Sequence, residues 1–422
     1  MSYSANRVAT ANMYDTALRN MGTRHSALSN LQENLTSGKR VLRASDDPVA
    51  AAQAERAMTR ITRIQTEQRA LDVQRNAVAQ AESTLGDAIG LMQEMRELVV
   101  SAGNGTFGPS DRATVAHQLQ GLRDQLLSVA NRKDTNGVPL LTALGSAATP
   151  FLNALGGFDG LAGQSAASTV TIPGALDGDA AFMFQPQRDA VFTARVDAAT
   201  PATHGLGSSA VSSSNPGQLA LDASGNAYQY QINVSYIAGS APGTLAAQYS
   251  VASVPAGAPL AGANPFTSAD FAPGQAASVP VDAIPGLSLN LTGKPALGDT
   301  LQLTLSPSSS IFETVDTAIR DIGTGSSSAA TQAVGQALAN MDTGLARLQN
   351  VRSYAGELLN RADRISGDQE ARGVQLEADR SRAEDLDMIQ GISDFQNQQV
   401  GYEAALKSYA MVQKLSLFNF IS

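Results

Sequence analysis

Apolar residues recur at helical spacing at both ends of the chain. Near the N-terminus, the stripe consists of Tyr14, Leu18, Met21, His25, Leu28 and Leu35. Near the C-terminus, the corresponding stripe consists of Met388, Ile392, Phe395, Tyr402, Leu406 and Tyr409, continued by Leu415, Leu417 and Phe418. Spacings that alternate between four and three residues are typical of the stripe that one helix presents to another. We therefore predict that the two ends of the chain meet as paired helices.

Two further helices are predicted before the middle of the chain. The first terminal helix, 8–36, should stop near Gly38, and Asp47 followed by Pro48 is a favourable N-cap for the next helix. That helix should run to about Ala102, since apolar residues recur every seven positions: Ile64, Leu71, Val78, Leu85, Met92 and Val99. A third helix should begin at a cap formed by Ser110 or Asp111 and end before the turn at 131–137.

The pattern changes between about residues 138 and 310. Charged residues are sparse there, and Gly and Pro separate short β-branched or alternating runs. These runs, which predict strands, are 168–173, 190–196, 228–237, 248–254, 287–291 and 300–305. We expect one β-rich domain with a sandwich-like or barrel-like fold.

Helical periodicity returns at Ile311 and continues from about Ser328 into a strongly charged stretch and then the C-terminal stripe. The charged stretch is typical of a solvated helical face with charge pairs four residues apart. The predicted fold class is therefore α+β and multidomain. Discontinuous helical domains are built from both termini, and a β-rich domain is inserted between them.

Composition excludes several classes of function. The chain has 422 residues and a net charge of −9, which argues against general nucleic-acid binding. It contains no cysteine, so disulfides and thiolate metal sites are excluded. The polar N-terminus predicts no cleaved signal peptide, and no apolar run is long enough to span a bilayer.

No catalytic, cofactor or metal site is predicted. The three histidines, His25, His117 and His204, have no metal-ligand spacing. The sequence Asp177-Gly-Asp179 favours a turn over a cation site. Since no nucleophile motif or phosphate-binding loop is present either, we predict that the protein is not an enzyme.

The terminal stripes indicate how the chain would act. A helix with a single apolar stripe gains most of its stability from packing against other helices. We therefore expect both ends to be frayed in an isolated chain and to fold when neighbouring subunits cover their other faces. This expectation favours a protein that assembles into a polymer.

Four segments resemble the flagellin superfamily of bacterial flagella. They are 7–14 (RVATANMY), 37–52 (SGKRVLRASDDPVAAA), 398–409 (QQVGYEAALKSY) and 415–421 (LSLFNFI). Within the superfamily, the DDPV sequence and the LSLF ending are similar to the hook–filament junction branch rather than to filament flagellins.

The resemblance implies a layered organisation and a structural role. It implies an inner coiled-coil domain (1–42 and 380–422), a helical rod domain (43–137 and 311–379) and a β-rich surface domain (138–310). The implied role is an adaptor ring that joins hook to filament outside the cell. The implied partners are further copies of the chain, the hook-side junction protein, flagellin or distal junction subunits, and a dedicated chaperone for type III export that holds the C-terminal stripe. Neither nucleic acid nor membrane is an expected partner. Two alternatives remain: a filament flagellin, or a surface-binding module carried by the central domain.

Overall fold

The computed structural model describes residues 3–142, 149–152, 157–159, 163, 168–200, 204–213, 215–324 and 327–421. The chain divides into two compact units, which we describe separately. One unit combines Met1–Arg69 with Ser366–Ser422, and the other is Ala70–Ile365. None of the helices in the described ranges has the length and apolar character that crossing a membrane requires.

Within the described ranges, the chain forms six long α-helices and two short ones. Their bounds are α1 Tyr3–Ser37, α2 Pro48–Ala102, α3 Pro109–Ala130, α4 Gly178–Phe182, α5 Pro186–Asp189, α6 Ile311–Thr324, α7 Ser327–Glu384 and α8 Met388–Ile421. The predicted start of α2 is confirmed, since Asp47 Oδ1 accepts hydrogen bonds from the N–H groups of Val49 and Ala50 at 3.1 and 3.0 Å.

The predicted cap of α3 is wrong. Gly108 is the N-cap and Pro109 is the first helical residue. Asp111 instead lies inside the first turn, where its carboxylate accepts a hydrogen bond from the Gly108 N–H at 2.9 Å. The helix begins earlier than expected because proline is favourable at a first helical position, where no N–H partner is needed.

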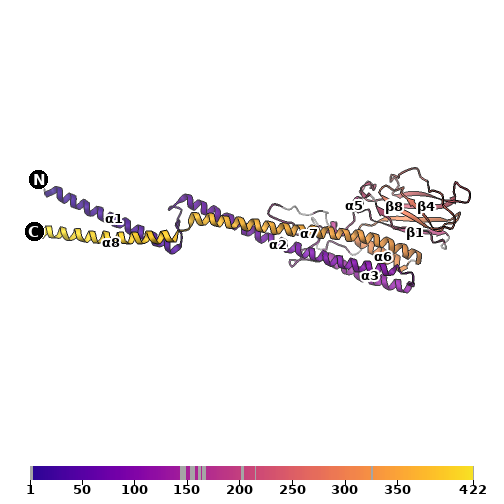
Figure 1. Ribbon diagram of the computed structural model, residues 1–422, viewed down its shortest axis with the longest axis horizontal. Coiled ribbons are helices and arrows are strands. Elements are labelled where there is room, and N and C mark those ends of the chain that lie inside the picture. Colours follow the sequence, from indigo (N-terminus) through magenta and orange to yellow (C-terminus); the bar gives the residue numbers. More distant parts are fainter. Residues whose placement is uncertain are drawn as a thin grey trace. The chain divides into compact units, whose positions relative to one another are not determined.

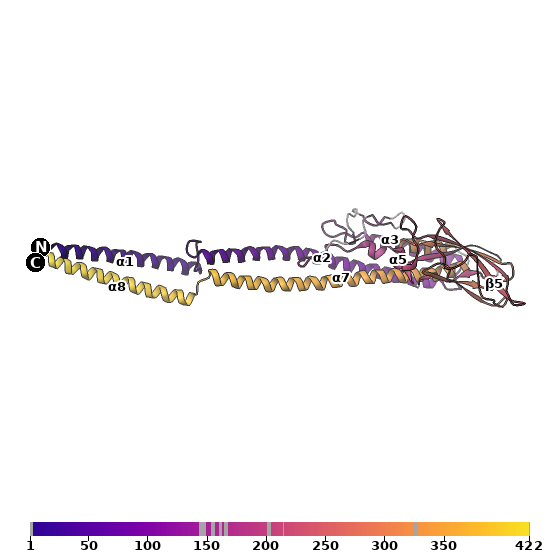
Figure 2. The same ribbon diagram turned by 90° about the horizontal axis from the view of Figure 1, so that it is seen from above.

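The first unit contains α1, α8, the first part of α2 and the last part of α7. Helices α1 and α8 lie side by side with both chain termini at the same end, as Figures 1 and 2 show. This arrangement confirms that the two ends of the chain meet as paired helices.

The second unit has a helical core formed by α2, α3, α6 and α7 (Figure 1). Its fully buried side chains include Leu85, Met92 and Met341. The buried Arg123 of α3 forms a bidentate ion pair with Asp316 of α6, with N–O distances of 2.9 and 3.0 Å. Arginine–carboxylate pairs of this geometry fix orientation as well as adding energy.

The segment that precedes the first strand packs with the helices. Phe151 and Phe182 are buried in the helical core, and the Phe182 ring stacks on Phe312 of α6 with centroids 5.5 Å apart. The predicted strand at 168–173 is wrong. Only a single bridge joins Ser168 to Thr171, and their hydroxyl oxygens lie 2.7 Å apart in a tight turn.

The described part of the β region forms nine strands in two antiparallel sheets. The bounds are β1 Phe192–Thr200, β2 Gly207–Ser208, β3 Ser212–Ser213, β4 Gln229–Ala238, β5 Leu245–Val254, β6 Phe266–Thr267, β7 Ala277–Val281, β8 Leu287–Gly293 and β9 Thr300–Pro307. One sheet has the order β1-β9-β4-β5-β6, and in the other β8 pairs with β2, β3 and β7.

Both sheets contribute to one hydrophobic core, so the sandwich form of the prediction is confirmed. Alternation explains the longest strands: in β4, Tyr230, Ile232 and Val234 are buried while Gln231 and Asn233 are exposed. The sequence predicted five of these strands and missed β2, β3, β6 and β7.

Candidate assembly surface

The stretch between α1 and α2 is bonded to the stretch between α7 and α8. The Leu386 N–H donates to Gly38 O at 2.9 Å, and the Arg40 N–H donates to Glu384 O at 2.7 Å. Lys39 forms an ion pair with the Glu384 carboxylate, and an Arg40 guanidinium nitrogen donates to Ala383 O at 2.9 Å. Two sequence-distant turns are thereby held together by backbone bonds at the base of the α1–α8 pair.

Two adjacent carboxylates organise the turn before α2. Asp46 accepts hydrogen bonds from the N–H groups of Leu42 and Arg43 at 3.2 and 2.9 Å. Its backbone bond from Arg43 holds the pKa of Asp46 below its usual range, and the bond from Ala50 does the same for Asp47. The DDP part of the flagellin-like segment therefore has a structural explanation in this chain: one carboxylate closes the turn and the other caps α2.

Helices α1 and α8 approach each other closely. The rings of His25 and Tyr402 lie 5.7 Å apart between centroids. A methyl group added at Gly391 would lie 3.2 Å from a Leu35 methyl carbon, and one added at Gly401 would lie 2.5 Å from an Arg24 nitrogen. The two glycines therefore allow a close approach of the helices.

The half-buried residues of α8 coincide with only part of the predicted stripe. Elsewhere along the helix they lie about one residue away from the predicted positions. They follow spacings of four and three at Phe395, Gln398, Tyr402, Ala405 and Tyr409, after the buried Gly391. The corresponding partly buried apolar positions of α1 include Ala17, Met21, Ala27, Leu28, Leu31 and Leu35. This register adds Gly391, Gln398 and Ala405 to the aromatic residues on the side of α8 that packs against α1, and sequence reasoning had no strong signal for these small or polar positions.

The structure places the predicted interface residues in two groups. Met21, Leu28, Leu35, Phe395, Tyr402 and Tyr409 are partly buried, while Leu18, His25, Met388, Ile392 and Leu406 are exposed. The side chains of Tyr14, Leu415, Leu417 and Phe418 lie outside the described residues. The role of all these residues as an assembly surface stays a prediction.

Helix α8 carries a further apolar face that sequence reasoning missed. Ile389 is 85% exposed, Val400 67% and Met411 64%, and the exposed Met388 and Ile392 lie beside them. Isolated apolar side chains on a surface are ordinary, but several along one helix mark a surface that another molecule can cover. The sequence does contain a signal for this face. The exposed apolar residues make the C-terminal stripe wider than the contact with one other helix requires.

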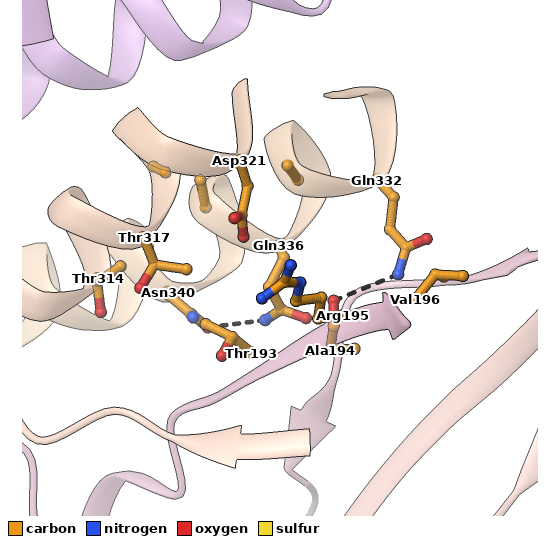
Figure 3. Close-up of a pocket in the computed structure, with 13 residues that line it drawn as sticks. Thr193, Ala194, Arg195, Val196, Thr314, Thr317, Asp321, Gln332, Gln336 and Asn340 are labelled. Carbon is orange, nitrogen blue, oxygen red and sulfur yellow. Dashed lines mark hydrogen bonds between the residues drawn. The ribbon is translucent and has the colours of Figure 1, made fainter. Parts of the chain in front are cut away.

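A cavity of about 230 Å³ lies between β1 and helices α6 and α7 (Figure 3). The buried Gln336 amide nitrogen donates to Phe192 O at 2.8 Å and to Asn340 Oδ1 at 2.9 Å, while its oxygen accepts from the Val211 N–H at 2.8 Å. Asn340 also donates to Phe192 O at 3.1 Å. Because these amides are engaged with strand backbone, they attach the sandwich to α7 and give the cavity a structural role.

The described ranges contain no group of three or more His, Cys, Asp or Glu side chains that could hold a metal ion. Asp177 is the N-cap of α4, and its carboxylate accepts from the N–H groups of Asp179 and Ala180. The local Asp-Gly-Asp sequence thus ends in a capped turn of helix.

Comparisons with known proteins give a consistent family. Residues 8–145 match the bacterial flagellin N-terminal helical region. Flagellar hook-associated protein 3 of Salmonella typhimurium is 36% identical over 156 residues, which cover 36% of this chain and 49% of that protein. The chain thus spans about half the length of this curated relative. Flagellins also match, including one from Clostridium tyrobutyricum that is 30% identical over 129 residues, or 31% of this chain and 34% of that protein.

Two solved structures from Legionella pneumophila share the fold. The flagellar junction protein FlgL is 28% identical with a TM-score of 0.56, over 74% of this chain and 99% of that chain. Flagellar hook-associated protein 3 is 26% identical with a TM-score of 0.59, over 78% of this chain and 97% of that chain.

Paired terminal helices, an inserted β domain and the match over residues 8–145 together make the chain similar to the bacterial flagellins. Among these proteins, it is a homologue of hook-associated protein 3 by both sequence and structure.

Proposed function

We propose that this protein is a structural, non-enzymatic subunit of the bacterial flagellum that joins the hook to the filament. The site of action is extracellular, at the hook–filament junction. The support comes from its homologues, since the relatives with the higher sequence identity are hook-associated proteins and the solved relative is a junction protein.

The proposed mechanism of assembly rests on one observation about helix α8. Helix α8 pairs with α1 through one face and leaves a second apolar face exposed, with Ile389, Val400 and Met411 at more than half of their full exposure. Burying apolar surface is the main favourable term in protein association. Further subunits that cover this face would stabilise the terminal helices and the polymer together.

A gene deletion tests the proposal. Cells without this protein should build complete hooks but release flagellin into the medium, and a plasmid copy should restore filaments. Immunolabelling of isolated hook–basal bodies should place the protein at the distal end of the hook. A deletion strain that keeps normal filaments would refute the junction role.

The second candidate is a filament flagellin, which the matches to flagellins favour. The same strain separates the two candidates. Loss of a flagellin would leave completed junctions with no filament and no flagellin in the medium, and label against this protein would extend along the whole filament of wild-type cells.

We also propose that a dedicated export chaperone binds the C-terminal stripe before assembly. An amphipathic helix that lays its apolar face into a groove is a common mode of recognition. Deleting residues 385–422 should abolish the complex, while the β sandwich and helical core keep their melting transition. A chaperone that binds the deleted form with wild-type affinity would show that its site lies elsewhere.

A further inference from the structure

A groove with basic walls lies in the first unit, between the start of α2 and the end of α7. It has a volume of about 640 Å³. Its apolar floor includes Ala50, Ala57 and Ala383, which are all buried. Four arginines line it, whereas the chain as a whole has a net charge of −9. The lining arginines are Arg40, Arg56, Arg60 and Arg382.

Two of these arginines are neutralised and two are not. Arg40 pairs with Asp47 at 3.4 Å, and Arg382 pairs with Asp379. Arg56 and Arg60 are exposed, and neither has an ion-pair partner among the described residues. They lie one turn apart on α2, so their side chains leave the same face of the helix.

A surface of opposite charge lies further along α2, in the second unit. Glu94 and Glu97 are exposed and also lack an ion-pair partner in the part of the chain that the structure describes. The neighbouring Arg96 is engaged with Asp342 at 2.7 Å, so it does not neutralise them. Gly90 and the 51% exposed Val100 lie on either side of the two glutamates. We call Gly90, Glu94, Glu97 and Val100 the acidic stripe.

We infer that the arginine groove binds the acidic stripe of a second copy of this chain. The inference rests on the proposed function, in which copies assemble side by side or end to end. Three features make the two surfaces complementary. Their charges are opposite and lack ion-pair partners in the described part of the chain, and on each surface the two charged residues lie on adjacent turns of the helix. Gly90, which has no side chain, lets another surface approach closely. Residues 56 and 60 would face residues 94 and 97 across the contact.

The contact would be directional. Groove and stripe are different surfaces of one chain, so each contact leaves one free groove and one free stripe. Such heterologous interfaces propagate into rings or helical arrays, whereas a two-fold interface stops at a dimer. The charges would determine which neighbour binds and in which register, while the apolar face of α8 contributes burial.

Charge reversal with restoration tests the inference. Three variants are expressed in the deletion strain: Arg56→Glu/Arg60→Glu, Glu94→Arg/Glu97→Arg, and all four changes together. The amount of exported protein and the flagellin in the medium are measured for each variant. Each double variant should lower the number of filaments per cell at least tenfold, and the fourfold variant should recover most of the loss. All three should melt within about 1 °C of wild type as purified monomers, since the four side chains are exposed and unpaired.

A cross-link provides an independent measurement. The natural chain has no cysteine, so Arg60→Cys/Glu97→Cys carries only the two introduced thiols. A bismaleimide should link copies into a ladder in isolated flagella, while either single variant and the dilute double variant stay monomeric.

The outcomes separate this inference from the junction role. If wild type restores filaments and the charge-reversed forms do so equally, the groove is not an assembly contact and the junction role stands. If only Arg56→Glu/Arg60→Glu lowers the number of filaments, or if the fourfold variant does not restore that number, the groove binds a different acidic partner and the second-copy assignment is wrong. If deletion of the gene leaves normal filaments, the junction role fails, and the cross-link still reports whether copies meet through these surfaces.

Discussion

Gln369 interrupts the apolar seam of α7. Its side chain is 2% exposed, and both amide atoms, Nε2 and Oε1, are buried without a hydrogen-bond partner in the described structure. It follows Ile365, the last α7 residue of the large helical core, and precedes Ala383, which belongs to a separate small cluster. A polar residue at such a seam position costs stability while it specifies register.

Replacing it with leucine should therefore stabilise the protein. Leaving a buried amide unsatisfied costs about 1–3 kcal/mol. Burying a leucine side chain contributes about 1.5–3 kcal/mol, part of which the aliphatic carbons of glutamine already supply. Allowing for imperfect packing of the new side chain, we expect Gln369→Leu to raise the free energy of unfolding by about 2 kcal/mol.

Hydrogen exchange and thermal melting measure this gain. Amides of α7 near position 369 should open with a free energy that is higher by about 2 kcal/mol, or roughly a 30-fold slower exchange. The control is Gln349→Leu, an exposed position on the same helix, which should change stability by less than about 0.5 kcal/mol. If Gln369→Leu exchanges as fast as wild type or faster, the glutamine amide is satisfied in solution and its destabilising role is wrong.

Three other perturbations follow from the structure. The Leu406 side chain is 40% exposed, so Leu406→Asp should leave the melting temperature of the monomer unchanged. The same change should abolish filament retention, because assembly would bury an unpaired charge. Ala256→Asp, on an exposed loop of the β domain, is the control, and the amount of exported protein is quantified for both variants. Asp316→Asn should lower the free energy of unfolding by about 1–2 kcal/mol in denaturant titration, since the buried Arg123 loses its bidentate ion pair with the Asp316 carboxylate. Hydrogen bonds from Ala241 N–H and the Ser240 side chain lower the pKa of Asp270 from 3.8 to about 2, so its contribution to stability is complete above pH 4 and is lost as the pH falls towards 2. The difference in melting temperature between wild type and Asp270→Asn should therefore be constant above pH 4 and shrink below it.

The sequence by itself determined where the long helices lie. The bounds of α2 could be predicted because Asp47, Pro48 and Gly103 act locally: a cap, a first-turn proline and a helix-ending glycine need no tertiary partner. The long strands β4 and β9 were predictable for a similar reason, since alternation of buried and exposed residues is recorded in each strand alone.

The tertiary structure decided which faces meet. The partly buried face of α8 includes Gln398 and Ala405 rather than Met388 and Leu406, because two close-packed helices favour small residues at Gly391 and its neighbours. An apolar stripe wider than one seam does not determine which half packs within the chain and which half stays exposed.

Long-range packing also determined that the segment before the β sandwich packs with the helical core. Phe151 and Phe182 join the helical core through Phe312, more than a hundred residues away in sequence. Their local composition resembles that of the β domain, so the sequence pattern offered no reason to separate them from it. The short strands β2, β3 and β6 escaped prediction because two residues cannot establish a period, and only the partner strand's hydrogen bonds define them.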